Sequence, residues 1–216
     1  MSKSQFVEGL DAIQAKVDSL LKPLGFQKKG RTHNRPTKGG LTHVVNFQKE
    51  KFAGQRPAFR FFKKKSYGKF AVNLGILLPC VYQVEWQRSP EEFVEEQQCE
   101  IRQRLSLVAF KQDKWFEITD DPSDLANTIV DLLQRFGLVF LNQIQTYEDV
   151  LSYYTEHGNL PLQTLGRANL EAALIAHHLG NGALAQSLFQ KAHATQHEGF
   201  QKYVAELAKR VGYTVK

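Results

Sequence analysis

The sequence predicts an α+β fold with an antiparallel sheet of about five or six strands, because strand-like and helix-like stretches occupy separate parts of the chain. An N-terminal amphipathic helix comes first, the strands follow, a packing helix comes next, and the last third is helical. The 216 residues, 42% hydrophobic and 11% aromatic, supply enough apolar surface for one domain or two. A parallel sheet would instead require strands and helices to alternate.

The amphipathic helix is expected over about Gln5–Lys22. Ser4 can cap its first turn, and the Pro- and Gly-containing segment Pro23–Gly25 ends it. After this helix the periodicity changes to that of strands. Phe26–Asn34 and Leu41–Lys49 are expected to form a hairpin, because the loop between them contains a proline and two glycines.

Two further strand pairs are expected in the middle of the chain. Ala58–Phe62 and Lys69–Leu77 would pair around a turn that projects lysines into water. Cys99–Val108 alternates apolar and polar residues, and it would form a second hairpin with Lys114–Thr119. Together with the first hairpin, these segments make the sheet.

Helices are expected on either side of this last hairpin and through the C-terminal third. The acidic segment Ser89–Gln98 is expected to be a short exposed helix, because Glu92 completes a capping box with Ser89. A longer helix begins at the acidic residues around Pro122 and ends at Gly137 as its C-cap. The C-terminal helices are expected near Tyr147–His157, Thr164–Leu179, Ala183–His197 and Phe200–Val211.

Several of these segments carry a family resemblance. They are Gly25-Phe26-x-Lys28-Lys29-x-Arg31, Val44–Lys49, Phe70-x-Val72-Asn73-Leu74-Gly75, Cys99–Leu107 and Lys114–Ile118. In this order after an N-terminal helix, they resemble the bacterial family called domain of unknown function 4304, over about residues 6–143. The chain departs from the family pattern by a longer basic insertion between Gln48 and Lys69, and by Leu107–Phe110 in place of a glycine-bearing turn. The resemblance implies a compact α+β domain and no established activity or catalytic residue.

The resemblance divides the chain into an α+β domain, residues 1–143, and a helical extension, residues 144–216. In the extension, Ala173, Ala185, Phe189 and Ala192 fit the small-residue pattern of one tetratricopeptide helix pair. A stacked array needs about three such repeats for stability. Helical hairpins that dock on the sheet domain are therefore favoured over a repeat array.

Positive charge is concentrated in one stretch of the chain. Lys22–Lys69 contains 14 Lys and Arg residues and one acidic residue, so it carries +13, whereas the rest of the chain carries −7 and the net charge is +6. Concentrated charge produces a local positive field, which indicates an anionic partner rather than a particular fold.

The function expected from this charge is that of a non-enzymatic binding or adaptor protein, whose anionic partner is a nucleic acid or an acidic protein, as for a toxin-neutralising immunity protein. Candidate contact residues are Lys28, Lys29, Arg31, Arg35, Lys63, Lys64 and Lys65. The alternative is an enzyme acting on a phosphorylated or nucleotide substrate, with Arg102 and Arg104 on one strand face as anion ligands. The basic stretch can also be a solvated surface, or can be neutralised by the acidic segment Glu91–Glu100.

No catalytic residue, cofactor or metal site is predicted. The motif Gly180-x-Gly182-x-x-Ala185 matches a dinucleotide fingerprint in letters only, because it lies between two predicted helices instead of following a strand. His193 and His197 share a helix face, but no third and fourth ligand is placed to complete a zinc site with them. Nucleophile and phosphate-loop motifs are not found.

A cytoplasmic location without a membrane partner is expected. The longest apolar run, Leu138–Leu141, is far shorter than the ~20 residues that span a bilayer, and the N-terminus has no apolar signal core. Cys80 and Cys99 are accordingly expected to be two reduced, packed thiols, although a bridge between them stays open.

Overall fold

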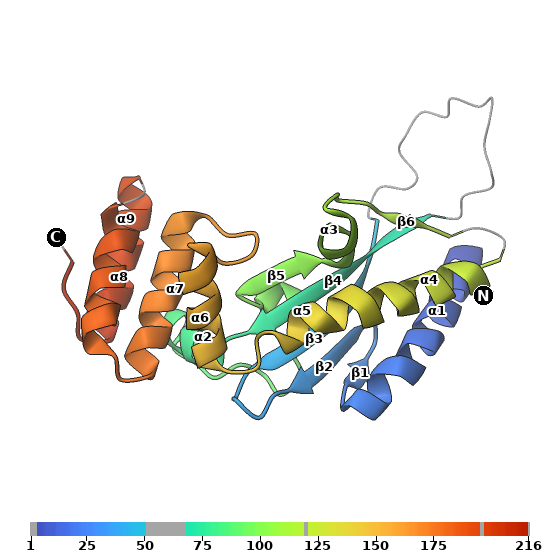
Figure 1. The fold of residues 1–216 in the computed structure, drawn as a ribbon, viewed down its shortest axis with the longest axis horizontal. Coiled ribbons are helices and arrows are strands. Elements are labelled where there is room, and N and C mark those ends of the chain that lie inside the picture. The colour runs from blue at the N-terminus through green and yellow to red at the C-terminus, as the bar shows by residue number, and fades with distance from the viewer. Residues whose placement is uncertain (1–3, 51–67, 119–120, 195–196, 216) are drawn as a thin grey trace.

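The computed structural model describes residues 4–50, 68–118, 121–194 and 197–215, and it confirms the α+β class (Figure 1). The strands are β1 (Gln27–Lys29), β2 (Thr32–Pro36), β3 (Thr42–Lys49), β4 (Lys69–Leu77), β5 (Ile101–Arg104) and β6 (Phe116–Glu117). The helices are α1 (Gln5–Leu21), α2 (Pro79–Trp86), α3 (Leu105–Phe110), α4 (Ser123–Leu132), α5 (Leu138–Asn142), α6 (Tyr147–His157), α7 (Leu165–His178), α8 (Gly182–Ala194) and α9 (Glu198–Arg210). Short 3-10 turns cover Lys22–Leu24 and Glu96–Gln98, and a π-helical turn, Leu133–Gly137, joins α4 to α5.

All strand pairings in the sheet are antiparallel, and the strand order is β1-β2-β3-β4-β5, with β6 also paired to β4. β5 pairs with Asn73–Ile76 of β4, and β6 pairs with Lys69 and Phe70 on the same strand. β4 is therefore interior to the sheet, which agrees with the burial of eight of its nine residues. β1 forms one edge of the sheet, and β5 forms the other.

The two faces of β4 carry different side chains, because successive residues of a strand point to opposite faces. Phe70, Val72, Leu74 and Ile76 belong to the main hydrophobic core, which they share with the apolar sides of α1, α4 and α5. Figure 1 shows these helices lying together over one face of the sheet. The opposite face carries Asn73 and Gly75, and at one end it carries Leu77, which packs in a smaller apolar cluster with Val44, Tyr82, Val94 and Cys99.

The helical C-terminus lies at one end of the molecule, beside the end of the sheet (Figure 1). α7 is its central helix, since ten of its fourteen residues are buried and it contacts α2, α6 and α8. The main hydrophobic core continues from the sheet into these helices without a break. The sequence-predicted bounds of α1, α6, α7, α8 and α9 are confirmed to within about three residues, as assignment at helix ends allows.

The segment Phe26–Asn34, predicted to be one strand, is instead a hairpin of its own. Gln27–Lys29 and Thr32–Pro36 pair through a turn at Gly30 and Arg31, and Gly30 has a φ of 59°, a left-handed conformation that glycine adopts without strain. The strand prediction for Lys69–Leu77 is confirmed as β4. Its predicted partner, Ala58–Phe62, lies outside the described residues.

The predicted hairpin of Cys99–Val108 with Lys114–Thr119 is wrong. Strand structure ends at Arg104, and the next residues form α3, in which Leu105 packs in the main hydrophobic core and Ser106 is also buried. β5 and β6 do not pair with each other but lie one after the other along β4.

The predicted helix Ser89–Gln98 is also wrong, and the helix in this region is α2, just before it. The side-chain amide of Asn34 holds the Val94 backbone extended, accepting from Val94 N at 2.6 Å and donating to Val94 O at 2.9 Å. A capping box is present, but it joins Glu95 and Gln98 around a single 3-10 turn.

Gly137 does not end its helix as predicted, because the helical backbone continues through it to Asn142. A Cβ at this position would lie 3.0 Å from Leu133 Cδ2 and 3.1 Å from Leu105 Cδ1. Glycine is therefore used here for close packing on α3 and the sheet rather than as a cap. No helix in the described ranges combines the length and apolarity needed to cross a bilayer.

We predict that Gly75→Ala destabilises the protein by about 1–3 kcal/mol, because the added methyl group overpacks the site. Its Cβ would lie 2.7 Å from Cys99 Sγ and 3.1 Å from Cys99 Cβ. Gly182→Ala is the matched control, since its nearest contact would be Tyr213 Oη at 3.4 Å, and there we expect no loss. Urea unfolding of both variants measures the difference, and equal stability of the two would contradict this account of β4.

Candidate functional site

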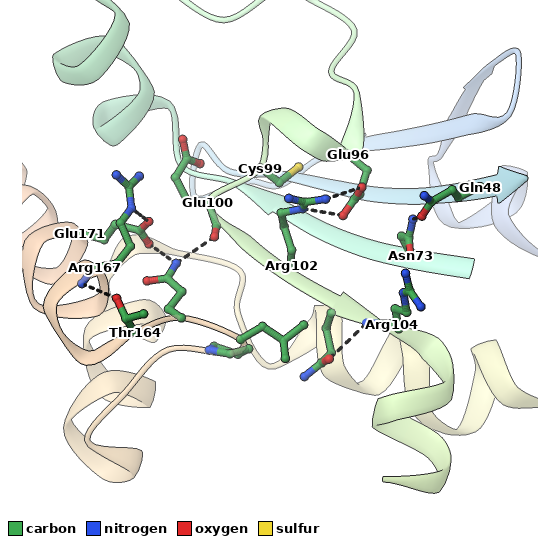
Figure 2. A pocket seen from close by; sticks show the side chains of 14 residues that line it. Gln48, Asn73, Glu96, Cys99, Glu100, Arg102, Arg104, Thr164, Arg167 and Glu171 are labelled. Atoms are coloured by element: carbon green, nitrogen blue, oxygen red, sulfur yellow. Dashed lines mark hydrogen bonds and ion pairs between the residues drawn. The ribbon is translucent and has the colours of Figure 1, made fainter. Parts of the chain in front are cut away.

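A polar cleft of about 550 Å³ lies where the β5 edge of the sheet meets the segment leading into α7 (Figure 2). Its lining comes from the polar face of the sheet, the turn before β5, and the start of α7. The lining residues are Gln48, Asn73, Glu96, Cys99, Glu100, Arg102, Gln103, Arg104, Pro161, Leu162, Gln163, Thr164, Arg167 and Glu171. A cleft of this volume falls within the range of about 300–1,000 Å³ typical of ligand sites.

A row of polar residues crosses four strands on the polar face. The strand register places Thr32, Asn46, Asn73 and Arg104 side by side on β2, β3, β4 and β5. Asn46 Nδ2 donates to Thr32 Oγ1 at 2.9 Å, and Asn73 Nδ2 donates to Gln48 Oε1 at 3.0 Å. Burying an amide in the middle of a sheet is costly unless it is hydrogen-bonded, so this row is a built polar surface rather than an incidental one.

Arg102 and Arg104 project from β5 on the same side as this row, and each is held by a carboxylate. Arg102 donates from Nε and Nη2 to the two oxygens of Glu96, at 2.7 and 3.1 Å, and these hydrogen bonds raise the pKa of Arg102. Arg104 Nη1 donates to both oxygens of Asp113, at 2.6 and 2.8 Å, while its guanidinium lies 4.9 Å from the centroid of the Trp115 ring. The predicted placement of both arginines on one face is thus what the structure has.

Arg167 joins two buried carboxylates at the far wall of the cleft. Its Nη1 lies 2.6 Å from Glu85 Oε1 on α2, and its Nε donates to Glu171 Oε1 at 2.7 Å. Burial lowers the pKa of Arg167, but the two carboxylates outweigh that effect and raise it, so the guanidinium stays charged. This ion network connects α7 to α2.

Gln163 extends the network to the strand edge. Its Nε2 donates to Glu171 Oε2 at 2.6 Å and to the backbone oxygen of Glu100 at 2.8 Å (Figure 2). Burial, together with the nearby charge of Glu171, raises the pKa of Glu100 well above its ordinary value. Burial also raises the pKa of Glu171, in spite of the neighbouring Arg167.

The two cysteines are free and buried, as the prediction of packed thiols requires. Burial raises the pKa of Cys80 to about 12, and it raises the pKa of Cys99 as well, so both thiols keep their protons at neutral pH. A protonated thiol is a poor nucleophile and a poor metal ligand. Among the described residues, no group of three or more His, Cys, Asp or Glu side chains is arranged to hold a metal ion.

The other predicted anion-binding residues that the structure describes do not line this cleft. Lys28 and Lys29 are exposed on β1, which forms the opposite edge of the sheet and lies four strand spacings, about 19 Å, from β5. Arg31 donates to Gln14 Oε1 at 3.0 Å, and Arg35 donates to Asn142 Oδ1 at 2.7 Å. Lys63, Lys64 and Lys65 lie outside the described residues.

Of the fourteen residues that line the cleft, only Arg102 and Arg104 were predicted as site residues. The other twelve include Gln48, Asn73, Glu96, Arg167 and Glu171. Asn73 could have been found as the polar residue within the apolar strand sequence of β4. Arg167 and Glu171 could have been found as a charged pair, four residues apart, in a helix otherwise rich in alanine and leucine. Gln48 and Glu96 carry no such signal, since both lie in polar segments.

The comparisons with known proteins identify a family but no activity. A family model described as domain of unknown function (DUF4304) matches residues 17–143, which is more than half of the chain, so the chain belongs to this family. The family resemblance predicted from sequence is confirmed. No curated protein and no solved structure matches the chain.

We predict that Arg167→Met destabilises the protein by about 3–5 kcal/mol, because it leaves the Glu171 carboxylate, only 1% exposed, without its counter-charge. The double variant Arg167→Met/Glu171→Met should recover only the part of this loss that comes from Glu171, because the largely buried Glu85 still lacks its counter-charge. Arg135→Met is the control, since its ion pair with Asp131 is solvent-exposed and should be worth less than about 1 kcal/mol. Denaturant unfolding of the three variants is the measurement, and equal losses at both arginines would contradict a structural role for this network.

We also predict that Glu100→Gln stabilises the protein increasingly as pH rises. A raised pKa means that Glu100 binds its proton more tightly in the folded protein than in the unfolded chain. Once the pH exceeds the pKa of Glu100 in the unfolded chain, the buried carboxyl group therefore lowers the free energy of unfolding. The glutamine keeps an acceptor for Leu78 N, which donates to Glu100 Oε2 at 2.7 Å. Unfolding curves of Glu100→Gln should show a larger gain in the free energy of unfolding at pH 8 than at pH 5. The control Glu91→Gln, at an exposed position, should show no gain at either pH. A gain of the same size at both pH values would contradict a raised pKa for Glu100.

Proposed function

We propose that this protein is a non-enzymatic binding protein that takes an anionic group of a partner into the polar cleft. The observation that carries the proposal is that Arg102, Arg104 and Arg167 line one cleft whose floor is the buried amide of Asn73. Guanidinium groups already fixed by carboxylates lose little conformational freedom on binding, so a ligand meets donors held in place.

An acidic protein segment suits this cleft better than a nucleic acid does. The lining contains the carboxyl groups of Glu96, Glu100 and Glu171 beside its three arginines. A phosphate backbone is bound by a surface with a strong excess of positive charge, which such a lining does not provide. An acidic protein segment can place one or two carboxylates against single guanidinium groups. It therefore does not need the large excess of positive charge that a phosphate backbone requires.

The lysines of the basic stretch have a supporting role in this proposal. In the part of this stretch that the structure describes, five lysines are exposed: Lys22, Lys28, Lys29, Lys38 and Lys49. Exposed positive charge steers an acidic partner toward the molecule and raises the association rate without specifying the contact. The specific contact is assigned to the cleft.

An enzyme acting on a phosphorylated or nucleotide substrate is the second candidate. It is favoured by Glu100, because burial raises the pKa of this carboxyl group and three arginines lie in the same cleft. A protonated carboxyl group of this kind could serve as a general acid. Its backbone hydrogen bond to Leu78 gives the same carboxyl group a structural role, which is why binding is the preferred function.

We predict that an end-capped hexaglutamate peptide binds the protein and that Arg102→Ala/Arg104→Ala weakens this binding at least tenfold, since each lost charged hydrogen bond is worth about 1.5–3 kcal/mol. Titrations at several salt concentrations, with circular dichroism to confirm folding, provide the measurement. Arg135→Ala, remote from the cleft, is the control and should leave the affinity unchanged.

Parallel titrations with single- and double-stranded oligonucleotides separate the alternatives. Steeply salt-dependent oligonucleotide binding that is lost in Lys63→Glu/Lys64→Glu/Lys65→Glu, but not in the arginine variant, would replace the proposal with nucleic-acid binding. Release of phosphate from a nucleotide that Glu100→Gln abolishes would favour the enzyme.

A further inference from the structure

β5 presents an outer edge to the cleft, because it is the last strand on its side of the sheet path and pairs with β4 through its inner edge. In an antiparallel pair, the N–H and C=O groups of successive residues point alternately toward the neighbouring strand and away from it. The unpaired edge of a sheet is a template for an added strand.

Two hydrogen bonds show which residues of this segment point away from β4. The Glu100 backbone oxygen accepts from Gln163 Nε2 at 2.8 Å, and the Arg104 backbone N–H donates to Gln103 Oε1 at 3.2 Å. Arg102 lies between them with the same parity, so its N–H and C=O also face outward, into the cleft. Both neighbouring bonds are to glutamine side chains, which a bound backbone can displace by offering equivalent groups.

The side chains along this edge specify an acidic strand. Arg102 and Arg104 are two residues apart on one face, the spacing at which successive same-face side chains of an added strand would lie. Arg102 uses Nε and Nη2 for Glu96, and Arg104 uses Nη1 for Asp113, which leaves at least one guanidinium nitrogen of each without a hydrogen-bond partner among the described residues. Acidic side chains two residues apart on the added strand would meet these donors.

Leu162 supplies an apolar contact at the other side of the cleft. It lines the cleft, its side chain is 66% exposed, and its φ is 55°, which is an unfavourable conformation for a branched residue. Strained residues of this kind concentrate at ligand-binding sites. An apolar side chain of a bound strand would cover Leu162 and remove it from water.

From these observations, and resting on the proposed function, we infer that the partner binds as an extended peptide segment that adds to the outer edge of β5. Its backbone pairs with the N–H and C=O of Arg102, and acidic side chains at alternate positions contact Arg102 and Arg104. The partner class is therefore a protein with an exposed strand or extended segment in which acidic residues alternate with apolar ones.

The first test uses end-capped heptapeptides in which glutamate alternates with valine or threonine, and fluorescence anisotropy with the full chain as the measurement. Peptides with lysine in place of glutamate should bind at least tenfold more weakly. Glu96→Gln should strengthen binding of the glutamate peptides a few-fold, because the amide oxygen can still hold Arg102 in place while the competing negative charge is removed. Equal binding of lysine and glutamate peptides would overturn the charge assignment.

The second test addresses backbone pairing directly. N-methylation of one set of alternate amides should weaken the glutamate peptide about fivefold, as the loss of the hydrogen bond to the Arg102 backbone oxygen predicts. Methylation of the other set should change the affinity less than about twofold. Equal effects of the two sets would overturn strand addition and leave the proposed function intact. Absence of binding by every glutamate peptide would contradict both.

A variant pair on the protein side completes the experiment. Arg102→Ala and Arg102→Pro both lose the guanidinium group, but only the proline lacks the backbone N–H, and proline is tolerated on an edge strand where that N–H faces outward. Arg102→Pro should bind the glutamate peptide several-fold more weakly than Arg102→Ala. If circular dichroism shows that the proline variant is unfolded, the methylated peptides decide the question alone.

Discussion

The interior position of β4 is the constraint on which the rest of the structure depends. Because the strand is paired on both edges, its alternate side chains must be accommodated above and below the sheet rather than at a rim. The helical layer is held on one face of the sheet because its apolar side chains bury those of Phe70, Val72, Leu74 and Ile76. On the other face, Cys99 packs closely over Gly75, whereas the polar side chain of Asn73 lines the cleft.

The C-terminal helices complete this site as well as extending the core. Gln163 and Arg167 reach the strand edge and α2, so the residues that follow the family domain form the far wall of the cleft. Their contacts are ionic and buried, a combination that stabilises little by itself but is sensitive to the removal of either partner. If the proposed function holds, binding in the cleft and the stability of the C-terminal helices depend on the same residues.

Sequence patterns predicted the elements in which apolar residues recur at a regular helical or strand spacing, such as α1, β4 and α6 to α9. They failed where tertiary contacts override local preference: Asn34 holds an acidic, helix-prone segment extended, and close packing carries a helix through Gly137. Of the candidate site, Arg102 and Arg104 were predictable from their alternation on one strand. Asn73 and Arg167 each carry a local signal, as a polar residue in an apolar strand and a charged residue in an apolar helix. Their meeting in one cleft was not predictable, because it depends on strand register and on helix docking.

The central claim is that the polar cleft, and not the β1 edge, receives the anionic partner. The most direct measurement is a nuclear magnetic resonance titration that follows arginine Nε–H and backbone signals as the hexaglutamate peptide is added. The account predicts shifts at Arg102, Arg104 and the Asn73 side-chain amide, with Lys28 and Lys29 little affected. Shifts confined to Lys28, Lys29 and the rest of β1, with the cleft signals unmoved, would contradict it.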